Sequence, residues 1–191
     1  MYLRLIASIA IIALPTFAFA HGSHGSGIMA GLTHPIFGLD HNFAILGTGI
    51  LAYLLDKKRW FYYVLAFLGA MIIGGMLGIG EEATFLIEKI IAFSVLAIGL
   101  LIAFRVKLNF FLALFILGIF GYFHGFAHGA EMAIDNTALK YISGFSIGTV
   151  FLASIGMLLA MLMSKINLKQ SYIYALGGGA ISCIGIFFLI P

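Results

Sequence analysis

The sequence predicts an all-α, polytopic membrane protein: a bundle of six transmembrane helices that follows a cleavable signal peptide. Of its 191 residues, 63% are hydrophobic and 9% are charged, and the mean hydropathy is +1.16. A soluble domain of this length needs a more polar surface. Apolar stretches also recur at the roughly 20-residue length that crosses a ~30 Å hydrocarbon layer. We therefore expect the lipid bilayer as the surroundings and no nucleic-acid partner.

Residues 1–20 have the three parts of a secretory signal peptide. Arg4 forms a short basic region, residues 5–14 form an apolar region, and Ala18-Phe19-Ala20 forms an A-x-A cleavage site. The alternative is a retained seventh span, although the apolar stretch is short for a bilayer. Both interpretations place His21 outside the cytoplasm.

Residues 21–32 are predicted to form a short periplasmic segment rich in His, Gly and Ser. Within it, the amine and imidazole of His21 and the imidazole of His24 are candidate groups for capturing a metal ion outside the cell. The alternative is a histidine-containing leader that has no function.

Residues 33–191 form the predicted transmembrane domain. When the first span runs inward, the loops alternate so that most Lys and Arg residues fall on the cytoplasmic side, as the positive-inside rule requires. We therefore expect a multi-pass membrane protein whose mature N-terminus and C-terminus both lie outside the cytoplasm. The predicted spans are residues 33–55, 60–80, 86–104, 108–129, 141–163 and 171–190.

The segment FHGFAHGAE, residues 123–131, places two imidazoles and a carboxylate on one helix face near the outer end of the fourth span. His124 and His128 are i,i+4 neighbours about 6 Å apart along the axis, and Glu131 follows three residues later. This spacing lets one helix chelate a divalent ion, as the histidine pair of H-E-x-x-H does. The alternative is that these histidines are hydrogen-bonded packing residues.

The segment HPIFGLDH, residues 34–41, lies at the outer end of the first span. In a continuous helix His34 and His41 differ by ~10.5 Å in height, which is too far for both to hold one ion. Pro35 and Gly38 favour an irregular helix start, so either His34 folds back toward His41 or the two histidines are separate stations. A lipid-facing Asp40 would be costly, so we expect it to face the bundle as an ion ligand or as an acceptor for an imidazole N–H.

Small residues at four-residue spacing predict close helix contacts at three places in the chain. The ridge formed by Gly121, Gly125 and Gly129 would let another helix approach and complete the coordination. Residues 69–78 and the pair Gly144 and Gly148 are also expected to pack against helices. The last pair belongs to GFSIG, which matches a G-x-S-x-G nucleophile pattern but lies in a predicted membrane helix.

The outer motifs H-P-x-x-G-x-D-H and F-H-G-x-x-H-G-x-E resemble those of the HupE/UreJ family of bacterial nickel or cobalt permeases. A third stretch, EKIIAFSVLAIGLL from Glu88, resembles that family's third span. The resemblance covers nearly the whole mature chain and implies a six-span permease of the bacterial inner membrane, with both termini of the mature chain in the periplasm. The metal residues that it implies by position are His34, Asp40, His41, Glu88, His128 and Glu131; His124 is added from helix geometry. Glu88 is implied by the resemblance alone.

The donor set narrows the choice of metal. Imidazole and carboxylate without thiolate suit Ni(II), Co(II) or Zn(II), and the single Cys183 forms neither an internal disulfide nor a thiolate-rich site. The preference for nickel comes from the resemblance, with Co(II) second and Zn(II) also compatible. The metal would be transported cargo, and we expect no permanently bound cofactor.

The leading hypothesis is a secondary permease that imports Ni(II) and serves metallochaperones or hydrogenase or urease maturation proteins, as the resemblance implies. An alternative from another class is an intramembrane zinc-dependent hydrolase, with Asp40 or Glu131 as the base. A third is a metal-sensing or structural subunit that binds without transporting. The inner half of an ion path has few polar side chains, chiefly Thr48, Ser94, Ser143, Ser146, Thr149 and Ser154.

Overall fold

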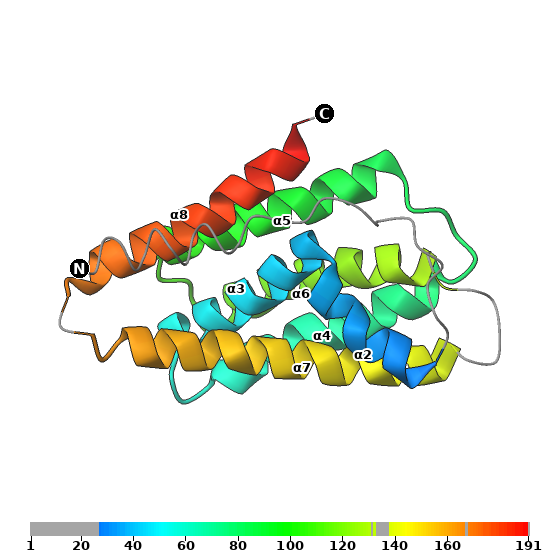
Figure 1. The fold of residues 1–191 in the computed structure, drawn as a ribbon, viewed down its shortest axis with the longest axis horizontal. Helices are drawn as coiled ribbons and strands as arrows, with labels where there is room; N and C mark the ends of the chain where they lie inside the picture. Colours follow the sequence, from blue (N-terminus) through cyan, green and yellow to red (C-terminus); the bar gives the residue numbers. More distant parts are fainter. Residues whose placement is uncertain (1–26, 131, 133–137, 167, 191) are drawn as a thin grey trace.

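The computed structural model describes residues 27–130, 132, 138–166 and 168–190 (Figure 1). Within these ranges, every regular element is an α-helix. The predicted signal peptide, His21, His24 and Glu131 lie outside the described residues. The helices are α2 (Ile28–Phe37), α3 (Leu39–Leu55), α4 (Trp60–Gly78), α5 (Phe85–Ala103), α6 (Phe110–Ala130), α7 (Ala138–Met163) and α8 (Gln170–Leu189).

The helices have the lengths and surfaces of membrane-spanning segments. Among the described residues, α4, α5, α6, α7 and α8 are each long and apolar enough to cross a bilayer, and α3 adds a shorter apolar helix. Large apolar side chains such as Phe111, Phe115 and Phe151 face outward, where lipid would cover them. The all-α, polytopic membrane character predicted from composition is therefore confirmed. The count of six spans stays a prediction.

The first predicted span, residues 33–55, is interrupted. It starts earlier than expected, as α2, and breaks at Gly38, whose extended backbone separates α2 from α3 (Figure 1). Pro35 lies inside α2 and has no N–H to donate, which weakens the helix at this point. The Gly38 N–H still donates to the carbonyl of His34, and the Gly38 carbonyl accepts from Asn42 as α3 begins. The irregular backbone predicted at Gly38 is confirmed, whereas Pro35 lies inside α2, near its end, and not at a helix start.

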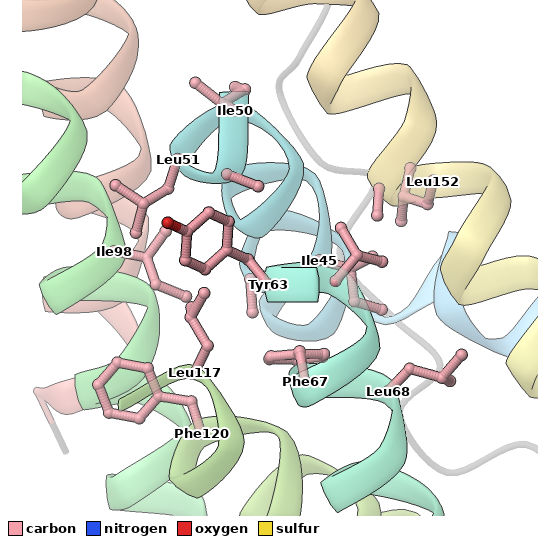
Figure 2. Close-up of a cluster of buried hydrophobic side chains, with 14 of the residues drawn as sticks. Ile45, Ile50, Leu51, Tyr63, Phe67, Leu68, Ile98, Leu117, Phe120 and Leu152 are labelled. Atoms are coloured by element: carbon pink, nitrogen blue, oxygen red, sulfur yellow. The ribbon is translucent and has the colours of Figure 1, made fainter. Parts of the chain in front are cut away.

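Helix α3 lies at the centre of the bundle, in contact with α2, α4, α5, α7 and α8. Its Ile45 and Leu51 are 1% exposed. Figure 2 shows these side chains meeting Phe67 of α4, Ile98 of α5 and Leu117 of α6. Almost the whole circumference of α3 is buried, so its apolar sequence reflects protein packing rather than contact with lipid.

Glycines allow the closest helix pairs to form. A Cβ atom on Gly121, Gly125 or Gly129 of α6 would collide with the backbone of α4, and one on Gly74 or Gly78 of α4 would collide with α6. Helix α7 packs in the same way on α2, through Gly144 and Gly148. The three predicted small-residue contacts are therefore confirmed for these glycines. Gly69, at the start of the second motif, has nothing within 4 Å of such a Cβ.

This packing predicts that Gly121→Ala destabilises the protein. The new methyl group would meet the Phe67 backbone, which cannot move as a side-chain end can, and overpacking of this kind costs about 1–3 kcal/mol. The melting temperature of the detergent-solubilised protein should fall by several degrees. Gly118→Ala, one turn earlier on the same helix, is the matched control because its Cβ would meet only atoms 4.0 Å away. Equal melting temperatures for the two variants would contradict the packing argument.

Candidate metal centre

Four histidines from three helices lie together inside the bundle. The ring centroid of His128 is 4.1 Å from that of His41 and 4.5 Å from that of His34. His124 lies 4.9 Å from His41. We call His34, His41, His124 and His128 the histidine cluster. The structure thus brings together the two histidine pairs that the sequence places in the first and fourth predicted spans.

Helix α6 supplies two members of the cluster from one face. His124 and His128 are i,i+4 neighbours and are only 1% and 2% exposed. Nδ1 of His124 lies 2.8 Å from the carbonyl oxygen of Phe120. Because a carbonyl only accepts, Nδ1 carries the hydrogen, and the Nε2 of a neutral ring then bears the lone pair. In metal sites, a ligating histidine commonly donates such a hydrogen bond from one ring nitrogen, and this fixes the tautomer whose other nitrogen can bind the metal.

The break at Gly38 positions the other two members. The ring centroids of His34 and His41 are 6.5 Å apart, less than the ~10.5 Å axial rise of seven residues in a continuous helix. Both rings also contact His128. Of the two arrangements left open by the sequence, the structure has His34 folded back into one cluster with His41, rather than two separate stations.

Aromatic side chains enclose the cluster. Phe145 of α7 is 5% exposed, and its ring lies 4.4 Å from that of His128. Tyr141, one turn earlier, lies 5.9 Å from His34. Phe67 of α4 covers His124 from another side, at 5.6 Å. None of these three aromatic residues was predicted from the sequence, although Tyr141 and Phe145 lie close to Gly144, whose packing role was predicted.

A small cavity of about 10 Å³ reaches His128 between α4, α6 and α7, and its lining includes Met71, Met132, Tyr141 and Phe145. It is about large enough for one water molecule. A hydrated divalent ion does not fit in this space.

The structure shows less about the acidic residues that the sequence predicts as metal ligands. Asp40 is in the first turn of α3, next to His41, but its side chain lies outside what the structure describes. Glu88 is in the first turn of α5 and is exposed, unlike the buried histidines of α6. Within the described ranges, no group of three or more His, Cys, Asp or Glu side chains is arranged to hold a metal ion. The assignment of metal ligands therefore stays a prediction.

One expectation about α6 needs correction. The ridge of Gly121, Gly125 and Gly129 was expected to admit the helix that completes the coordination, but it packs against α4, which contributes no histidine. The other two histidines of the cluster come from α2 and α3. The reason is that glycines let backbones touch, and such contact leaves no room for a metal and its ligands. The ridge therefore stabilises α6 from behind the cluster.

Comparison with known proteins places the chain in a family. Residues 9–188 match the family described as "HupE / UreJ protein". The chain is 37% identical over 190 residues to "Protein HupE" of Rhizobium leguminosarum bv. viciae, an alignment that covers 99% of this chain and 98% of the relative. No solved structure matches. With a family match over almost its full length and a whole-length relative, the chain belongs to the HupE/UreJ family.

Proposed function

We propose that this protein is a secondary permease that imports Ni(II), and Co(II) as a second substrate, across the bacterial inner membrane. The observation that carries the proposal is the histidine cluster: four imidazoles from three helices whose nearest ring centroids are 4.1–4.9 Å apart. The imported metal would supply metalloenzyme maturation. The proposed ligands, near the periplasmic face, are His34, Asp40, His41, Glu88, His124, His128 and Glu131.

The chemistry of the cluster supports a late first-row divalent ion. Neutral imidazole and carboxylate are the ligands that Ni(II), Co(II) and Zn(II) share, whereas Cu(I) prefers sulfur. Cys183 is free and exposed on α8, so it adds no thiolate to the buried histidines. Membership of the HupE/UreJ family favours nickel within this group and a permease over the alternative intramembrane hydrolase.

The membrane potential is a sufficient driving force for import. A divalent cation gains ~4.6 kcal/mol per 100 mV when it moves to a negative interior. A permease site must also release its ion, so its affinity has to be modest. A set of donors that does not converge on one point before the ion arrives is compatible with such an affinity.

Replacing His128 with Ala should abolish most nickel uptake. Its ring is the one that lies closest to both His34 and His41, so its loss removes a donor and the two shortest ring contacts of the cluster. We expect nickel accumulation in expressing cells to fall at least tenfold, on the basis that a lost metal-site group typically costs 10–100-fold. Cys183→Ala is the control, since it removes a potential ligand outside the cluster. Unchanged uptake by the His128 variant at equal membrane abundance would rule out the proposed site.

Nickel flux into proteoliposomes should depend on voltage. With a valinomycin-imposed potassium gradient, initial uptake should increase as the interior becomes more negative, because each ion carries two charges down the potential. The His128→Ala protein should show no such increase. Nickel binding without flux at any potential would instead identify a sensing or structural protein.

A further inference from the structure

The inner half of an ion path needs polar groups, and most hydroxyl groups in the bundle are already engaged. Thr48 donates to the Ala44 carbonyl and Ser94 to the Ile91 carbonyl. Ser143, Ser146 and Ser154 each donate to the carbonyl four residues earlier in α7. In these five residues the hydroxyl hydrogen is used within the residue's own helix, which is the usual state of Ser and Thr in membrane helices.

Thr149 differs from these five residues. It is completely buried, with 0% of its surface exposed, and its Oγ1 has no hydrogen-bond partner among the described residues. A Thr hydroxyl in a helix normally bonds to a carbonyl three or four residues earlier. A buried hydroxyl that makes no bond is costly and rare, so its presence needs an explanation.

The position of Thr149 links it to the histidine cluster. Tyr141, Phe145 and Thr149 follow one another at i,i+4 on the buried face of α7, about 6 Å apart along the axis. The rings of Tyr141 and Phe145 contact the cluster, and Phe145 packs on His128. Since α7 runs inward in the predicted orientation, Thr149 is the first polar residue on this face beyond the cluster.

Gly148, the residue before Thr149, shows that this turn of α7 lies against α2, the helix that carries His34. A Cβ on Gly148 would lie 2.7 Å from the Leu32 carbonyl oxygen and 3.3 Å from the Pro35 ring. Helix α7 is therefore held against α2 directly beside His34. The Thr149 side chain, buried at this level, lies inside the bundle and not toward lipid.

We propose that the Thr149 hydroxyl is the ligand that the divalent cation meets next on its inward route. The cation would leave the histidine cluster with part of its water shell and then bind the Thr149 oxygen. This inference rests on the proposed permease function. A neutral hydroxyl oxygen binds such an ion more weakly than imidazole does, so it supports passage and not retention. Its role would be to replace part of the water shell where the surrounding side chains are apolar.

The test compares three variants in nickel flux and nickel binding. Thr149→Val keeps the shape but removes the hydroxyl, Thr149→Ser keeps the hydroxyl, and Ser182→Ala removes a buried hydroxyl of α8 that donates to the Gly178 carbonyl of its own helix. We expect Thr149→Val to lower maximal flux in proteoliposomes at least fivefold, while the Kd of the purified protein for Ni(II) stays within twofold of wild type. Thr149→Ser and Ser182→Ala should each retain at least half of the flux.

The outcomes separate this inference from the proposed function. The Thr149→Val variant is expected to fold, because the substitution removes no hydrogen bond of Oγ1. The melting temperature of this variant should match or exceed that of the wild type. Wild-type flux in Thr149→Val, an equal loss in Ser182→Ala, or an equal loss in Thr149→Ser would each overturn the role of the hydroxyl. If the wild-type protein carries no nickel flux, the permease function fails and the Thr149 role fails with it.

Discussion

An interrupted helix is tolerated at membrane depth only where protein encloses the freed backbone groups, and this constraint shapes the bundle. The break at Gly38 divides the first predicted span into α2 and α3. Helix α7 covers α2 at close range because Gly31, Gly144 and Gly148 carry no side chains, and it then continues along α3. The same break brings His34 and His41 to His128. Thus the enclosure that stabilises the irregular backbone also encloses the histidine cluster.

Two helix pairs support this arrangement from outside. Helices α4 and α6 touch along their glycines, which fixes the rotation of α6 so that His124 and His128 face α3 and not lipid. Helices α5 and α8 form the other pair, in which Lys89 donates hydrogen bonds to the carbonyls of Phe188 and Leu189 at the end of α8. Figure 1 shows α5 and α8 running side by side along one edge of the bundle. The α4–α6 pair therefore borders the cluster directly, through Phe67, His124 and His128.

Much of the fold and the position of the cluster was predictable, because membrane solvation restricts the options. The positions and lengths of the apolar stretches predicted helices close to those observed. The four-residue spacing of His124 and His128 predicted that both lie on one helix face. The sequence could not show which helix fills the Gly121 ridge, since a small-residue motif carries no partner identity. Nor could it identify Phe145 or Thr149 as neighbours of the cluster, because an aromatic or a Thr in an apolar helix has the same pattern whether it faces lipid or a site.

Charge compensation is the physical reason for proposing carboxylate ligands beside the cluster. Neutral imidazoles replace water ligands but bring no negative charge, and the walls formed by Phe67, Tyr141 and Phe145 provide little solvation. A doubly charged ion in such surroundings is strongly disfavoured unless anionic groups approach it. The sequence places Asp40 next to His41 and Glu131 three residues after His128. In the proposed site, one carboxylate from each of these two positions would balance the two charges of the ion, and moving either away would favour its release.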